Sequence, residues 1–258
     1  MPNTLENTAL NKLPAITLAF WIMKITATTL GETGGDWLSM TMNVGYLMST
    51  IIFFVIFVIA LSAQLASKRH YPILYWAVIV ATSTAGTTMS DYMDRTLELG
   101  YAKGATILIT ILLGTLALWR WTCGSLNVNS IRSRKAEVFY WVTILFSNTL
   151  GTALGDFLSD DSGLGFFGSW LLISLVLLII VGLNSFTKLP RMLLFWVAFI
   201  LTRPFGATFG DVLTKTREHG GLDIGPGYAS LVLLAILAIT VFISYRKPPI
   251  EQACEPNN

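Results

Sequence analysis

The chain has 258 residues, of which 53% are hydrophobic and 12% are charged, with a formal net charge of +2. Its mean hydropathy of +0.64 lies well above that of soluble domains, which excludes an ordinary soluble protein and indicates an integral membrane protein. Basic residues flank apolar stretches and form no basic patch with interleaved aromatics, so we expect no nucleic-acid partner.

Eight apolar stretches follow one another along the chain, and each approaches the roughly 20 residues that a helix needs to cross a bilayer. They cover residues 14–30, 45–66, 72–86, 105–119, 138–155, 166–183, 189–209 and 228–245. Lys24 lies within the first stretch, which argues against a cleaved signal peptide, whose apolar region is short and uncharged. The sequence therefore predicts an all-α integral membrane fold with eight transmembrane helices.

The charged residues set the expected orientation. An even number of spans puts both termini on one side, where eleven Lys and Arg fall against four in the opposite loops, so the positive-inside rule places both termini in the cytoplasm. Eleven of the fifteen acidic residues fall at the opposite, outer side, whose potential should attract cations. Cys123 and Cys254 fall in predicted cytoplasmic segments, so we expect neither a disulfide nor a zinc site.

One pattern occurs four times: a tryptophan followed, fifteen residues later, by an aspartate at the end of an apolar stretch. The pairs are Trp21 and Asp36, Trp76 and Asp91, Trp141 and Asp156, and Trp196 and Asp211. A glycine stands five residues before each aspartate and a glycine or serine one residue before it, which is typical of helix-packing motifs. A glycine–aromatic pair then opens each second span, as Gly45-Tyr46, Gly100-Tyr101, Gly165-Phe166 and Gly227-Tyr228.

These spacings predict four repeats within a single membrane domain that covers residues 1–258. The repeats are placed at residues 14–66, 72–119, 137–183 and 189–245, with a cytoplasmic linker at about 120–136 and a disordered tail at about 247–258. Each repeat holds two spans, so every copy should enter the membrane in the same direction. We therefore expect four parallel two-helix repeats around a pseudo-symmetry axis along the membrane normal.

The fourfold register resembles a bacterial membrane-protein family defined by a four-times-repeated domain of unknown function, each copy having two transmembrane segments and a tryptophan. The resemblance covers about residues 14–245. It implies the architecture, and with the charge distribution it implies a multi-pass protein of the bacterial cytoplasmic (inner) membrane.

Each odd-numbered span carries a polar stripe that ends at its aspartate, because positions 12, 8 and 4 residues earlier lie on the same helical face. Polar groups avoid lipid, so the four stripes should line a central polar path. A carboxylate at membrane depth is costly, and four copies of it indicate a shared ion-binding site. The residues expected to bind the ion are Asp36, Asp91, Asp156, Asp211, Glu32, Thr33, Thr88, Thr152, Thr208 and Asn148.

Two bases lie in the same stripes. Lys24 and Arg203 are expected to neutralise buried carboxylates, and the alternative is a tethered cation that replaces the transported ion in one conformation. Pro204 should kink the seventh helix and free a carbonyl near the site. The tryptophans, about 22 Å of helix from the aspartates, are expected to be interfacial belt residues near the cytoplasmic side rather than parts of a gate or cage.

Oxygen ligands without His, Cys or Met pairs suit Mn²⁺, Mg²⁺ or Ca²⁺. We therefore predict a transporter of a small cation, either a divalent metal or a proton-coupled substrate, with membrane lipids as its other partner and no cofactor. The alternatives are a non-catalytic membrane scaffold or regulatory anchor and, with less support because no catalytic constellation is present, an intramembrane metal-dependent enzyme. Four repeats can close a unit alone or leave a face for a homo-oligomer, and the sequence favours neither.

Overall fold

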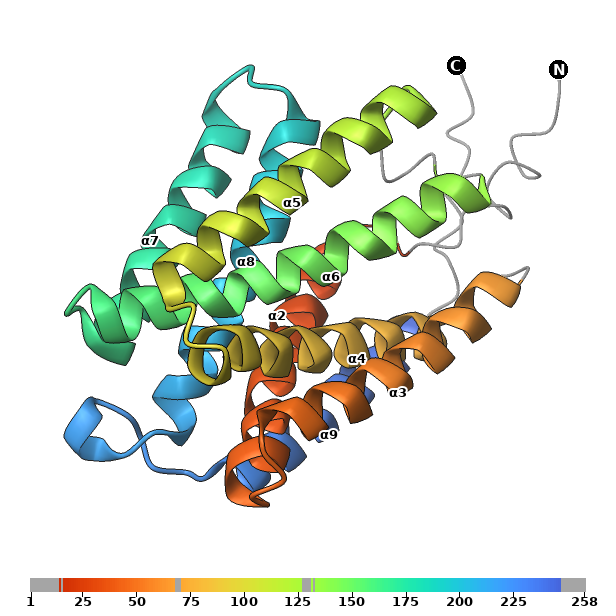
Figure 1. The fold of residues 1–258 in the computed structure, drawn as a ribbon. Helices are drawn as coiled ribbons and strands as arrows, with labels where there is room; N and C mark the ends of the chain where they lie inside the picture. Colours follow the sequence, from red (N-terminus) through yellow and green to blue (C-terminus); the bar gives the residue numbers. More distant parts are fainter. Residues whose placement is uncertain (1–13, 15, 68–70, 127–130, 132, 247–258) are drawn as a thin grey trace, which may run out of the picture.

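The computed structural model describes residues 14, 16–67, 71–126, 131 and 133–246. Regular structure in these residues is helical throughout, and eight long helices account for most of it (Figure 1). They are α2 (Leu18–Asp36), α3 (Tyr46–Ala66), α4 (Pro72–Asp91), α5 (Tyr101–Cys123), α6 (Arg134–Asp156), α7 (Gly165–Phe186), α8 (Arg191–Thr214) and α9 (Pro226–Arg246). The all-α architecture and the number of helices agree with the sequence-based prediction.

The helices α5 and α6 extend into the segment predicted as a linker, since α5 ends at Cys123 and α6 begins at Arg134. The predicted tail at 247–258 lies outside the described residues. Six helices, α3 and α5 to α9, are long and apolar enough to cross a membrane, whereas α2 and α4 are not. Most side chains of α2 and α4 are buried against other helices, so these two helices need little apolar surface.

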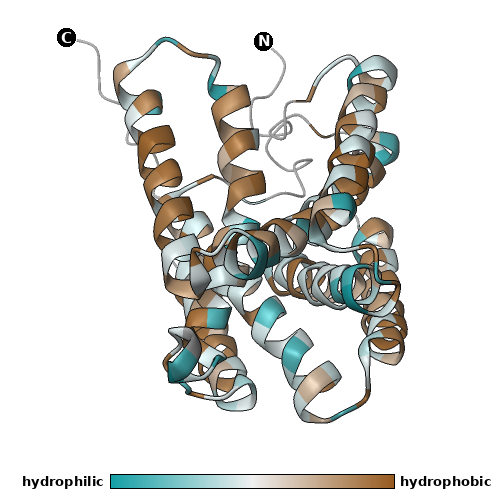
Figure 2. Ribbon diagram, turned by 60° about the vertical axis from the view of Figure 1, so that its left-hand side comes forward, coloured by the Kyte–Doolittle hydropathy of each residue, from teal (hydrophilic) through white to brown (hydrophobic). Residues whose placement is uncertain are grey.

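Four helices form a closed inner ring, in which α2 and α6 each pack against both α4 and α8. The other four lie outside this ring, with α3 on α4, α5 on α6, α7 on α8 and α9 on α2. Each outer helix therefore covers the inner helix of the following repeat, and the last repeat closes back on the first. Hydrophobic residues predominate along the peripheral helices in Figure 2.

The inner helices approach closely because glycines face side chains of the neighbouring repeat. The glycine five residues before each aspartate lies against the residue eight before the next aspartate, in the pairs Gly31 with Ser83, Gly86 with Asn148, Gly151 with Arg203 and Gly206 with Thr28. A Cβ atom added to any of these glycines would lie 2.2 to 3.0 Å from the nearest atom of the facing residue, at or below the closest approach of a real Cβ atom. The packing role predicted for the glycines is confirmed.

A short π-helical turn continues α2, α4 and α6 beyond their aspartates, at Trp37–Thr41, Tyr92–Thr96 and Phe157–Asp161. The following outer helix then begins at or just after a glycine with positive φ, which is Gly45, Gly100 or Gly165. In the fourth repeat a 3-10 turn, Arg217–His219, occupies the longer loop. In this repeat the glycine with positive φ before the outer helix is Gly225, at φ +83°. The prediction that Gly227-Tyr228 opens the helix is therefore wrong by two residues, because this pair lies inside α9.

The repeat tryptophans pack inside the bundle. Trp76, Trp141 and Trp196 are buried at 5% exposure or less, and Trp21 is partly buried against Phe195. Aromatic contacts run from one repeat to the next, as between Phe20 and Trp76 at a centroid distance of 5.8 Å. The expectation of interfacial belt residues is therefore wrong for Trp76, Trp141 and Trp196, because the bundle buries these indoles as an aromatic layer at one end, whereas Trp21 stays partly exposed.

The glycine contacts predict opposite effects of the same substitution at two sites. Gly206→Ala should destabilise the protein by roughly 1 to 3 kcal/mol, because the new methyl would meet Thr28, whose backbone carbon lies at 3.0 Å. Gly114→Ala, on the exposed face of α5 with no atom within 4 Å, should stabilise it by about 0.5 to 1 kcal/mol. Thermal unfolding in detergent measures both, and equal effects would contradict the packing account.

Candidate cation site

The four repeat aspartates lie in the last turns of the four inner helices and are all buried, at 2 to 4% exposure. An acidic residue at a helix C-terminus faces the negative end of the helix dipole, and burial removes the water that would otherwise screen it. Each of these carboxylates therefore needs positive charge nearby.

Two basic side chains supply that charge, each bridging a pair of aspartates. The Lys215 ammonium lies 2.8 Å from Oδ2 of Asp36 and 3.3 Å from Oδ1 of Asp211. The Arg95 guanidinium lies 3.3 Å from Oδ1 of Asp91 through Nε and 3.6 Å from Oδ2 of Asp156 through Nη2. The four aspartates are thus divided into two pairs, each joined by one base.

Arg95 and Lys215 were missed as site residues because, in the sequence, they fall among the loop bases. The signal was present, since each stands four residues after a repeat aspartate and a spacing of four brings charges together on a helix. Only the second and fourth repeats have a base there, while the first has Met40 and the third has Asp160. The aspartate layer therefore has twofold rather than fourfold character.

Lys215 stands just beyond α8, and its side chain is 23% exposed. Burial acts to lower the pKa of this ammonium, but the carboxylates of Asp211 and Asp36 outweigh burial and raise it well above the usual value. Lys215 therefore stays charged at neutral pH while it remains between the two carboxylates.

A second polar layer lies four residues deeper and contains the most buried ion pair. Nη2 of Arg203 lies 3.0 Å from Oε2 of Glu32 and also donates to the hydroxyls of Thr152, at 2.8 Å, and Thr87. Both threonines in turn donate to Oε2 of Glu32, at 3.1 Å for Thr87 and 3.4 Å for Thr152. All four repeats contribute to this network, which fixes the centre of the inner ring.

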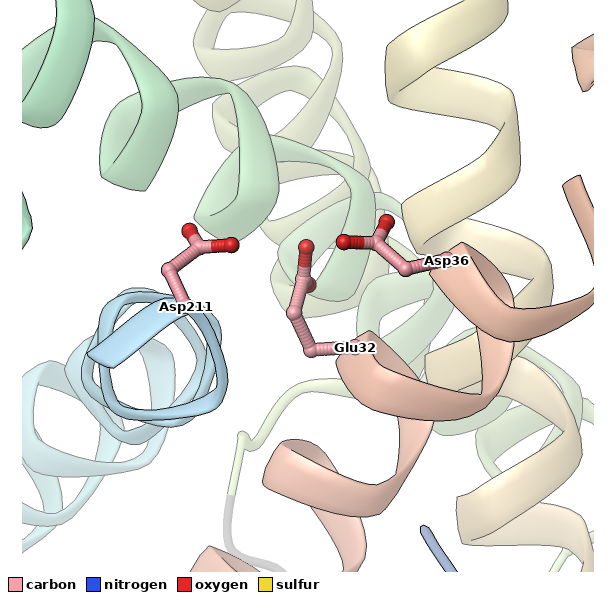
Figure 3. A group of neighbouring side chains, drawn as sticks. All are labelled: Glu32, Asp36 and Asp211. Atoms are coloured by element: carbon pink, nitrogen blue, oxygen red, sulfur yellow. The ribbon is translucent and has the colours of Figure 1, made fainter. Parts of the chain in front are cut away.

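Glu32 connects the two layers. It forms a group with Asp36 and Asp211 in which one carboxylate oxygen of each lies within 4.8 Å of the others. Figure 3 shows the three carboxylates directed toward one another, two from α2 and one from α8. Next to them, Oδ2 of the buried Asp91 has no hydrogen-bond partner among the described residues. Such a group of hard oxygen donors has the chemistry of a divalent cation site.

Four other predicted ligands lie away from this group. Thr33 accepts a hydrogen bond of 2.8 Å from Ser230 of α9, and the hydroxyls of Thr88 and Thr208 bond carbonyls of their own helices. Asn148 is buried against Gly86, where its amide has no partner among the described residues. Thr33, Thr88 and Thr208 each stand three residues before an aspartate, and each lies against a glycine of a neighbouring inner helix, whereas the third repeat has Ala153 there. Thr87, one position before Thr88, instead donates to Glu32 and so joins the site.

The two predicted intramembrane bases behave differently. Arg203 pairs with Glu32, whereas the Lys24 ammonium lies 4.0 Å over the ring of Phe199 and pairs with no carboxylate in the described part of the chain. The expected pairing of Lys24 with a buried carboxylate is therefore wrong, because Arg203 from the neighbouring helix already occupies Glu32. Pro204 lies within α8, which continues through it, and its ring packs against Gly151.

A family model described as Repeat of Unknown Function (DUF347) matches the chain four times, over residues 19–70, 74–125, 139–189 and 194–248. Each match covers one inner helix and the outer helix that follows it. Comparison with curated proteins found no match, and comparison with solved structures found none either.

The buried Glu32–Arg203 pair can be tested with substitutions that the other repeats already carry. Glu32→Thr copies Thr87 and Thr152, and Arg203→Ser copies Ser83 at the equivalent position. Each single change should destabilise the protein by about 3 to 5 kcal/mol, because it leaves an uncompensated buried charge. The double variant should recover most of that loss, and additive losses in a thermal or denaturant double-mutant cycle would contradict the pairing.

Proposed function

We propose that this chain, which belongs to the family of the Repeat of Unknown Function (DUF347), is a multi-pass protein of the bacterial cytoplasmic membrane that transports a small cation. The cation is a hard divalent metal such as Mn²⁺, Mg²⁺ or Ca²⁺, exchanged against or coupled to protons. A fold alone assigns no activity, and the buried carboxylates are what support transport of a cation.

The proposed arrangement has the four repeats parallel around an axis along the membrane normal. Its support is a repeated register of contacts between neighbouring inner helices. The residue five before an aspartate contacts the residue eight before the next repeat's aspartate, as Gly151 contacts Arg203. The residue one before an aspartate contacts the residue four before the next repeat's aspartate, as Gly155 contacts Ala207. Contacts that advance together along both helices favour parallel neighbours. The distribution of basic residues then puts the termini in the cytoplasm and the aspartate layer toward the outside.

One observation carries the proposal: three buried carboxylates, those of Glu32, Asp36 and Asp211, converge with a single ammonium between two of them. Among the buried groups of both polar layers, five carboxylates face three bases, which leaves a formal excess of two negative charges. Asp160, which lies 3.9 Å from Arg95, is 38% exposed to solvent and is not counted. Lys24 is excluded from this count because it lies two helical turns from Glu32. One divalent cation, or two protons, would balance that excess.

Lys215 is the residue that the incoming cation would displace. Its ammonium occupies the space between Asp36 and Asp211, it is partly exposed, and a lysine side chain is a flexible point charge. Arg95 holds the other aspartate pair with a planar guanidinium that is less easily replaced. The cation site is therefore assigned to the pair that Lys215 bridges.

A carrier fits better than an open channel. On the tryptophan side of the polar layers, the ring interior is filled by Ile79, Ile144 and Phe199, each buried at 1% exposure or less. The equivalent residue of α2 is the buried Lys24, whose ammonium lies over the Phe199 ring. The aromatic layer lies beyond them. A cation bound among the carboxylates could leave toward the cytoplasm only after the inner helices rearrange, as alternating access requires.

One observation favours a second candidate, a non-catalytic membrane scaffold or regulatory anchor. Every carboxylate of the two layers has a basic partner in the described structure, so the charges could serve only to fix the packing of the ring. The two candidates differ in their response to metal, because a scaffold has no reason to bind a divalent ion.

Transport by the purified protein in liposomes tests the proposal. Wild-type protein should admit Mn²⁺ to an entrapped indicator, and Asp36→Asn should slow uptake at least tenfold because it removes a ligand and the partner of Lys215. Asp223→Asn is the matched control, since Asp223 is exposed in a loop at a positive φ that asparagine tolerates. Uptake no faster than in empty liposomes, with each of the three metals and with an imposed pH gradient, would overturn the proposal.

Removal of the internal ammonium separates the carrier from the scaffold. Lys215→Met should lower stability without metal and increase the stabilisation by Mn²⁺, because the ion no longer competes with the lysine. A saturating ion at about 100 times its Kd adds about 2.7 kcal/mol. Lys103→Met, which removes an exposed base, should leave the metal response at its wild-type value. Thermal unfolding unaffected by metal in all three proteins would support the scaffold.

A further inference from the structure

An apolar groove of about 830 Å³ lies near the tryptophan end of the bundle, far from the aspartates. Its walls come from the beginning of α2, the last turns of α7 and the first half of α8, including Trp21, Ile25, Ile180 and Phe195. Its volume falls within the usual range for small-molecule sites, about 300 to 1,000 Å³. The polar side chains in the lining are Asn184 of α7, Arg191, the first residue of α8, and Thr202, whose hydroxyl already donates to the Phe199 carbonyl of its own helix.

The groove exists because one repeat lacks a side chain that the preceding repeat has. Trp119 lies eighteen residues after Tyr101 in α5, and its ring packs between Tyr140 and Trp196 at centroid distances of 6.5 and 5.6 Å. The equivalent residue of α7, eighteen after Phe166, is Asn184. One repeat further along, Phe195 takes the position of Tyr140 and Trp21 takes the position of Trp196. Both of these residues line the groove. The smaller asparagine leaves open the space that Trp119 fills elsewhere.

The groove has the shape and chemistry of a lipid site. From Arg191 to Thr202, which also lines it, α8 rises about 16 Å, enough to lie along much of one acyl chain. The wall is mostly apolar, while the guanidinium of Arg191 supplies positive charge at one end. None of the equivalent positions in the other repeats, Ile16, Tyr71 and Ala136, is basic. Basic pockets between transmembrane helices on the cytoplasmic side bind anionic lipid headgroups.

We propose that this groove binds one anionic phospholipid of the surrounding membrane, with its phosphate at Arg191, its ester region at Asn184 and one acyl chain along Phe195 and Ile180. This site rests on the membrane placement proposed above and is independent of cation transport. The orientation from the basic residues puts the groove in the cytoplasmic leaflet, whose surface is negatively charged and rich in such lipids.

The experiment reconstitutes the protein in vesicles of phosphatidylglycerol and phosphatidylethanolamine, re-extracts it in mild detergent, and counts the retained lipids by native mass spectrometry. Wild-type protein should retain about one phosphatidylglycerol per chain. Arg191→Gln should reduce its retention several-fold, because the phosphate loses its partner. Asn184→Trp should abolish it, because the indole would fill the groove as Trp119 fills the equivalent space.

Two matched controls should retain the lipid as wild type does. Arg134→Gln removes the exposed base at the start of α6, and Val197→Trp adds an indole to an exposed face of α8 outside the groove. A Tm for Asn184→Trp at or above the wild-type value would show that the indole packs in the groove. If Asn184→Trp does not fold, Arg191→Gln decides the proposal.

The proposal is overturned if wild type retains no more phosphatidylglycerol than Asn184→Trp, or if phosphatidylethanolamine is retained equally well. It is also overturned if wild type dimerises through this face and Asn184→Trp yields monomers, because a second copy would then be the occupant. Lipid retention is measured without any ion gradient, so its failure leaves the cation proposal untouched, and loss of transport leaves the lipid result unaffected.

Discussion

Buried charge inside the inner ring governs how the other helices of this bundle can pack. Buried carboxylates at the ends of four helices are tolerable only where opposite charge lies within contact distance. Arg203 provides it for Glu32 at the centre, and Lys215 and Arg95 provide it for the aspartates. The close approach of the helices at their glycines makes these distances short, so the packing and the electrostatics require one another.

The bundle consequently has three zones along its axis. An aromatic layer and the apolar side chains beside it close one end, the Glu32–Arg203 network holds the middle, and the bridged aspartates occupy the other end. Four repeats form the bundle, but they differ at single positions. Lys215 and Asn184 are two such positions, one within the proposed cation site and the other within the proposed lipid site.

Much of the fold follows from the sequence, because its signals are local or periodic. Apolar length predicted the eight helices, and the repeat register predicted which glycines face a neighbouring helix. The errors concern partners that only the three-dimensional ring decides. Lys24 shares a helical face with Glu32, yet Arg203 from another helix forms the ion pair with that carboxylate. The Lys24 ammonium instead lies above the ring of Phe199. The spacing of the tryptophans from the aspartates predicted an interfacial belt, but Trp76, Trp141 and Trp196 are buried, and periodicity alone could not distinguish the two.

The proposed cation site is the space that Lys215 now occupies between Asp36 and Asp211. Crystals of the protein grown with Mn²⁺ and measured at the manganese absorption edge test it most directly. We expect an anomalous peak within coordination distance of Glu32, Asp36 and Asp211, with the Lys215 side chain turned away. An undisturbed Lys215 between the two aspartates and no peak at saturating Mn²⁺ would contradict it.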